Sequence, residues 1–92
     1  MIRLFKVEGN SLYPHLNNGQ RIVCLKLFKF SKIAIGDFVV FSKKPHGLMI
    51  KRVEKIKNGM FFVQGTDPMS IDSRDFGWIK RADIQYKKIA LH

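Results

Sequence analysis

Turn-forming residues recur at short intervals along this chain, so only short regular segments fit between them. Chain reversals are predicted at Asn17-Asn18-Gly19, at Ile35-Gly36-Asp37 and at Asn58-Gly59. The intervening segments are rich in β-branched and aromatic residues, which favour strands. We expect strands at residues 4–8, 21–27, 38–41, 48–56, 60–64 and 84–91. The sequence therefore predicts an all-β fold of mainly antiparallel strands.

Some segments carry more specific signals. Asn58-Gly59 is a strong hairpin signal and joins the strand at 48–56 to the strand at 60–64. The continuous apolar run from Phe38 to Phe41 fits a strand buried on both faces. Residues 66–77 form a polar loop of twelve residues, a length that is commonly functional, and a turn is expected at 80–83.

Length and composition exclude several classes of protein. A chain of 92 residues is one domain, because two halves would each be too small to bury a core. Hydrophobic residues at 46% and charged residues at 26% exclude a disordered or low-complexity chain. The longest apolar runs are far shorter than the roughly 18 residues of a membrane-spanning helix. The start lacks the pattern of a secretory signal, so we expect a cytoplasmic protein.

The single cysteine and the charge balance bear on partners. Cys24 cannot form an internal disulfide, belongs to no zinc-binding pattern and is expected in the core. Seventeen Lys and Arg residues against seven Asp and Glu give a net charge of +10, which favours an anionic partner. Nucleic acid, an anionic membrane surface and an acidic protein all meet that requirement.

Ser11 and Lys51 are the residues that suggest chemistry. On the expected strand, Lys51 shares a face with Met49 and Val53, so its amine would lie on an apolar surface. Desolvation lowers the pKa of a lysine, and a neutral amine can activate a serine hydroxyl as a general base. The alternatives are that Lys51 extends its amine to water and that Ser11 bonds its own backbone in a turn.

Four blocks of sequence then occur in a particular order. They are Val7-Glu8-Gly9-Asn10-Ser11-Leu12-Tyr13-Pro14, Gly36-Asp37-Phe38-Val39-Val40-Phe41, Ile50-Lys51-Arg52-Val53 and Ser70-Ile71-Asp72-Ser73-Arg74-Asp75-Phe76-Gly77. In this order the chain resembles the type I signal peptidases and their relatives, from Val7 to Ile84. The last block is more similar to signal peptidases than to the self-cleaving LexA-type repressors.

The resemblance implies a fold and a set of roles. It implies the small, coiled, β-barrel-like fold of the signal peptidase and LexA catalytic core, with Ser11 as nucleophile and Lys51 as its base. It implies that Ser70 bonds the catalytic lysine and that Asp72 and Arg74 form a structural pair that holds the long loop rigid. The alternative for that pair is a surface contact worth about 0 to 1 kcal/mol. No metal or cofactor is implied.

The chain departs from the family pattern at several positions. Some signal peptidases carry a hydroxyl two positions before the nucleophile, but Gly9 stands there, which leaves the Ser11 backbone N–H as the expected oxyanion donor. A second donor could be the backbone near Gly9 and Asn10 or the Asn10 side chain. Leu12 replaces a methionine, whereas Gln20 and Thr66 each replace an aspartate.

The histidines offer a rival base. His15 is close to Ser11 in sequence, and a Ser-His pair would be another way to activate the hydroxyl. His46 and His92 show no triad or zinc spacing, and no block of the resemblance includes any of the three.

The resulting prediction is a serine endopeptidase that uses a Ser/Lys dyad to cleave a leader or signal-type segment from a precursor protein. The substrate would bind as an extended strand. With Asp67-Pro68 before the last block, the chain looks similar to the short soluble maturation proteases that trim precursors of nickel-containing superoxide dismutase. No specific nucleic acid is expected as a partner of such an enzyme.

Two alternatives concern the basic surface. A non-enzymatic β-barrel module that binds nucleic acid would account for the charge and for Phe28 and Phe30 among lysines. Residues 25–33 interleave bulky apolar side chains with cations, which suits peripheral contact with an anionic membrane surface. The other interpretation of residues 25–33 is a strand with a solvated basic edge.

Overall fold

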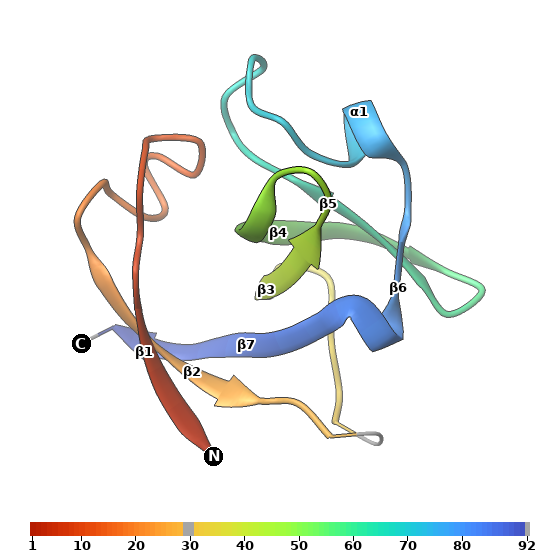
Figure 1. Ribbon diagram of the computed structural model, residues 1–92, viewed down its shortest axis with the longest axis horizontal. Coiled ribbons are helices and arrows are strands. Elements are labelled where there is room, and N and C mark those ends of the chain that lie inside the picture. The colour runs from red at the N-terminus through yellow and green to blue at the C-terminus, as the bar shows by residue number, and fades with distance from the viewer. Residues whose placement is uncertain (29–30, 92) are drawn as a thin grey trace.

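Seven strands form one sheet, which confirms the prediction of an all-β, mainly antiparallel fold (Figure 1). The computed structural model describes residues 1–28 and 31–91, with no side-chain description for residue 91. The strands are β1 (Ile2–Lys6), β2 (Arg21–Lys26), β3 (Phe38–Lys43), β4 (Gly47–Lys57), β5 (Met60–Gln64), β6 (Ile79–Lys80) and β7 (Ile84–Leu91). The helices are the single turn α1 (Ser73–Phe76) and the 3₁₀ helix η1 (Arg81–Asp83).

The order of the strands brings distant parts of the chain together. It runs β1-β2-β7-β3-β4-β5-β6, and every neighbouring pair is antiparallel. Figure 1 shows β7, in blue, crossing the molecule between the β1–β2 pair and β3. The sheet is coiled and open, because β1 and β6 are its two edges and no ladder joins them within the described ranges.

The predicted hairpin between β4 and β5 is confirmed. Lys57 pairs with Met60 at its end. Asn58 and Gly59 have φ angles of 52° and 72°, the left-handed conformation that a two-residue hairpin turn requires.

Two local predictions are corrected by the structure. The first strand spans Ile2–Lys6 rather than 4–8, because the chain bends away after Lys6 and Val7 bonds the turn residue Gln20 (N to O, 2.8 Å). The loop at 66–77 contains α1, which Asp72 and Asp75 stabilise by a reciprocal capping box.

The turn expected at 80–83 begins at the end of β6 and continues as η1.

The hydrophobic core is divided between the two faces of β3. Val40 packs in one cluster with Leu12, Leu16, Ile22 and Cys24, while Val39 and Phe41 pack in the other with Val53, Val63 and Ile79. The prediction that the run from Phe38 to Phe41 is buried on both faces is confirmed for its last three residues; Phe38 itself is partly buried. Cys24 is a core residue as expected, and burial raises the pKa of its thiol to about 11.

Two further observations concern contact with a membrane and the predicted basic segment at 25–33. In the part of the chain that the structure describes, no helix is long and apolar enough to cross a membrane. In the segment at 25–33, Phe28 is 64% exposed, whereas Lys29 and Phe30 lie outside the described residues. His92 also lies outside them.

Candidate active site

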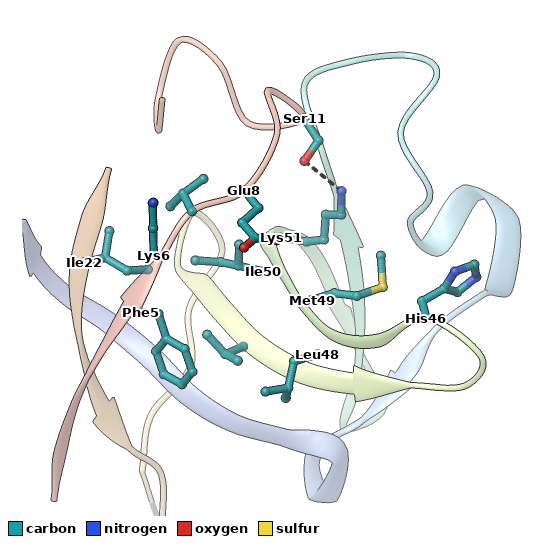
Figure 2. A pocket seen from close by; sticks show the side chains of 12 residues that line it. Phe5, Lys6, Glu8, Ser11, Ile22, His46, Leu48, Met49, Ile50 and Lys51 are labelled. Carbon is teal, nitrogen blue, oxygen red and sulfur yellow. Dashed lines mark hydrogen bonds between the residues drawn. The ribbon is translucent and has the colours of Figure 1, made fainter. Parts of the chain in front are cut away.

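Ser11 and Lys51 meet although forty residues separate them in the sequence. Lys51 Nζ lies 3.0 Å from Ser11 Oγ, within hydrogen-bond distance (Figure 2). Lys51 comes from the middle of β4, and Ser11 comes from the loop that follows β1. The proximity expected from the sequence is therefore present.

Lys51 is held in a nearly dry position. Its side chain is 4% exposed, it pairs with Val39 of β3, and Val53 on the same strand is fully buried. Burial is the largest influence on its amine and lowers the pKa; Asp72 opposes the shift, whereas Arg74 reinforces it. Within the described ranges Lys51 forms no ion pair. Burial therefore makes the neutral amine easier to form than in an exposed lysine.

The loop that carries Ser11 is pinned at both ends. Gly9 adopts a φ of 83°, which lets the chain turn sharply after β1. Leu12 and Leu16 are both 1% exposed, and they anchor the following turn in the core. The Gly19 N–H donates to the Val7 carbonyl at 2.7 Å and closes the base of the loop.

Gly65 and Thr66 hold the backbone of Ser11, and neither was singled out for this role by the sequence. The Ser11 carbonyl accepts a hydrogen bond from the Thr66 N–H at 2.6 Å. The Thr66 hydroxyl lies within hydrogen-bond distance of two carbonyls, that of Tyr13 at 2.5 Å and that of Ser11 at 3.0 Å. A Cβ atom on Gly65 would lie only 2.6 Å from both the Ser11 carbonyl and Ser70 Oγ, so only glycine permits this approach. The sequence offered one signal for this role, which was their position: Gly65 follows the expected strand at 60–64, and Thr66 begins the long loop.

Asp72 organises the long loop. It is fully buried, and both of its oxygens accept hydrogen bonds from the Arg74 side chain, at 2.9 Å from Nε and 2.6 Å from a terminal nitrogen. It also accepts from the Gly65 N–H at 2.9 Å. Burial by itself raises the pKa of Asp72, but the hydrogen bonds from Arg74, Gly65 and Ser70 outweigh it and hold the pKa well below its usual range. A surface ion pair is therefore the wrong description.

Ser70 does not make the contact that the resemblance implied. Its hydroxyl donates to Asp72 Oδ2 at 2.9 Å and accepts from Arg74 at 3.1 Å. In the described part of the chain no hydrogen bond joins Ser70 to Lys51. The physical reason is that a buried carboxylate two residues away is a stronger acceptor than an amine.

The two candidate oxyanion donors differ in position. The Ser11 N–H donates no hydrogen bond to any described residue, so it is free to bind a substrate oxygen. Asn10 is exposed and lines a neighbouring hollow with Tyr13 and Thr66, outside the pocket that Ser11 and Lys51 share. The structure therefore does not bring the Asn10 side chain to the dyad.

A pocket of about 350 Å³ adjoins the dyad. It lies between the end of β1 and the β3–β4 hairpin, with Phe5 and Ile22 on one side of the dyad and His46 on the other (Figure 2). Apolar wall residues are Phe5, Val7, Ile22, Val40 and Ile50, and the charged residues Lys6 and Glu8 also line it. The pocket is suited to side chains of a bound peptide.

The histidines contribute no base to the dyad. His15 is exposed and packs against Phe38 with the ring centroids 6.0 Å apart, and it forms no hydrogen bond with Ser11. His46 lies beyond Met49 from Lys51 (Figure 2), and it forms no hydrogen bond with Ser11 among the described residues. Among the described residues, no group of three His, Cys, Asp or Glu side chains could hold a metal ion.

Comparison with known proteins adds no relative. A scan against protein-family models finds no match, and a search of curated proteins finds no similar sequence.

Proposed function

We propose that this protein is a serine endopeptidase in which Ser11 is the nucleophile and Lys51 is its general base. The observation that carries the proposal is the 3.0 Å separation of Ser11 Oγ from an amine that is 4% exposed. An unactivated serine is a poor nucleophile near neutral pH, and a desolvated lysine is one of the few groups that can take its proton.

The reaction would proceed through an acyl-enzyme. Ser11 Oγ attacks the peptide carbonyl carbon while its proton passes to neutral Lys51 Nζ, and the Ser11 N–H donates to the carbonyl oxygen as it becomes negative. Lys51 returns the proton to the leaving amine as the C–N bond breaks. Water then attacks the ester, again giving its proton to Lys51, which passes it to Ser11 as the acid product leaves.

The substrate would be a precursor protein bound in an extended conformation. Among the described residues, β1 has no partner on its outer edge, and its Phe5 lines the pocket beside the dyad, so a segment laid along this strand would reach Ser11. A leader or signal-type segment fits this mode. We also propose that the protein is a signal peptidase-like peptidase, similar to the short maturation proteases, and that it acts in the cytoplasm.

The proposal is tested with a peptide library prepared from a digested proteome. The wild-type protein is incubated with the library, and new amino termini are labelled and identified by mass spectrometry. Cleavage is expected for the wild type and for Lys55→Ala, an exposed lysine of the same strand. It should be lost in Ser11→Ala and in Lys51→Arg, because a guanidinium stays protonated. Equal cleavage by Ser11→Ala would overturn the proposal.

A further inference from the structure

One face of the β1–β2 pair carries an uncovered apolar patch. Ile2 lies opposite Leu25 in the ladder, and Leu4 lies opposite Val23. Ile2 is 62% exposed and Leu4 is 50% exposed, while Val23 and Leu25 are half-buried between them and β7. These four residues are called the outer patch below.

The alternation of the strands shows that the outer patch faces away from the core. Phe5, Ile22 and Cys24 each adjoin a patch residue in sequence, and they belong to or pack against the core cluster on the opposite face. A monomeric protein gains nothing by exposing aliphatic side chains side by side, so such a patch indicates a surface that is covered in use.

The charge around the outer patch is mainly positive. β1, β2 and β7 contain no acidic residue, but they contain the cations Arg3, Lys6, Arg21, Lys26, Lys87 and Lys88. Of these, Lys87 forms an ion pair with Asp37 at 3.5 Å. Lys6 and Arg21 lie opposite each other in the ladder, on the same face as the patch, and both are exposed. Neither forms an ion pair with a described residue. An anionic surface would complement this arrangement.

We propose that the outer patch docks on the surface of an anionic lipid bilayer. Aliphatic side chains would enter the boundary between headgroups and acyl chains, while Lys6 and Arg21 would contact the negative headgroups. Nucleic acid fits less well, because the patch offers no aromatic side chain on which bases could stack. This surface differs from the predicted segment at 25–33, with which it shares only Leu25.

The inference does not depend on the peptidase proposal, and its test uses no enzyme activity. The protein is sedimented with vesicles of phosphatidylglycerol and phosphatidylcholine, and with vesicles of phosphatidylcholine alone. Binding is expected only to the anionic vesicles, and it should weaken as salt is raised because the headgroup attraction is screened. An absence of binding to the anionic vesicles overturns the proposal.

Matched variants separate the patch from the general charge. Leu4→Asn should weaken vesicle binding roughly tenfold through the lost apolar burial, and Arg21→Gln should weaken it roughly fivefold. Ile56→Asn and Lys57→Gln are the control variants. They also replace an aliphatic and a cationic side chain by neutral polar ones, but on β4, and β7 and β3 lie between β4 and β2. These controls should bind like the wild type, and thermal melting followed by circular dichroism checks that all four variants are folded.

Two results would overturn the assignment even if the protein binds vesicles or polyanions. Equal weakening by the patch variants and by their controls would mean that net charge, not the outer patch, drives binding. Stronger binding to a single-stranded oligonucleotide, reduced by Arg21→Gln but unchanged by Leu4→Asn, would assign the surface to nucleic acid instead.

Discussion

At the scale of single residues, the proposed chemistry depends on how strongly the surroundings of Lys51 disfavour its charge. Lys51 is buried, lacks an ion-pair partner among the described residues, and lies at hydrogen-bond distance from Ser11. Buried lysines without a carboxylate partner are uncommon because desolvation of an ammonium is costly. Such a position reduces the stability of the fold, and strongly perturbed groups of this kind are concentrated at functional sites.

The lowered pKa of Lys51 predicts the pH dependence of cleavage. Only the neutral amine can accept the Ser11 proton, so kcat/KM should rise tenfold per pH unit on the acid side. Because burial lowers the pKa, the rise should level off below the ordinary lysine value of about 10.4. Measurement of kcat/KM between pH 5 and 10 checks this. A rate that is independent of pH on the acid side would exclude Lys51 as the base.

Thr66 is predicted to position Ser11. Thr66→Val keeps the side-chain volume but removes the hydroxyl that bridges the carbonyls of Ser11 and Tyr13, and so loosens the loop that carries the nucleophile. A small shift of a nucleophile costs roughly ten- to a hundredfold in rate, so kcat should fall by that order while KM stays nearly constant. Thr66→Ser keeps the hydroxyl and should restore most of the activity. Steady-state kinetics of both variants test this prediction. An equal fall in kcat for Thr66→Val and Thr66→Ser would show that the hydroxyl does not position Ser11.

At the scale of elements, the loop between β5 and β6 is built around one carboxylate. Asp72 caps α1 and accepts hydrogen bonds from Gly65 at the end of β5, and so joins the helix to the sheet. The same loop presents Thr66 to Ser11. The loop after β1 and the loop after β5 rise on the same side of the molecule (Figure 1). The rigidity of the site is therefore a property of these two loops together.

Loss of the Asp72 charge should destabilise the protein in a pH-dependent way. Asp72→Asn removes the buried carboxylate that accepts hydrogen bonds from Arg74 and Gly65, and should lower the free energy of unfolding near neutral pH. The folded state lowers the pKa of Asp72, so its stabilisation is complete above the unfolded value of about 3.9 and is lost as pH falls below it. Urea unfolding of both proteins between pH 2 and pH 7 should show the difference shrink in acid. A difference that stays constant with pH would contradict this account.

At the scale of the whole molecule, β7 is the element that unites the fold. It pairs with β2 on one side and with β3 on the other, and it contributes Tyr86 to one core cluster and Ile84 to the other. The two clusters lie on opposite faces of β3 and share no buried residue. Because a central strand is common to both, neither cluster is expected to unfold alone.

A single cooperative unfolding transition is therefore predicted. Ile22→Ala in one cluster should cost about 3 kcal/mol by leaving a cavity. The only tryptophan, Trp78, lies next to Ile79 of the other cluster. In Ile22→Ala, the urea midpoint of unfolding should fall by the same amount whether it is measured by Trp78 fluorescence or by circular dichroism. Ile84→Ala, in the second cluster, is the matched control and should shift both signals equally. Separate midpoints for the two signals would show that the clusters unfold independently.

Local patterns accounted for most of the strands. The hairpin at Asn58-Gly59 and the doubly buried β3 follow from turn chemistry and an apolar run, which depend on neighbours in the chain. The exact end of β1 and the presence of α1 were missed. Both depend on hydrogen bonds, of Val7 with Gln20 and of Asp72 with Asp75, that a strand pattern does not encode.

Residue types and their immediate neighbours made Ser11 and Lys51 candidates, because a lysine between apolar residues on one face of a strand is unusual. Their roles as nucleophile and base came from the resemblance of four ordered blocks to signal peptidases. The strand order made them neighbours, with β7 inserted between β2 and β3 and the loop after β1 reaching over β4. Folding likewise turned the Ser70 hydroxyl towards Asp72 and brought Thr66 onto the Ser11 backbone. Long-range pairing and burial set these contacts, since a hydrogen bond forms with whichever partner the packed chain brings within 3 Å or so.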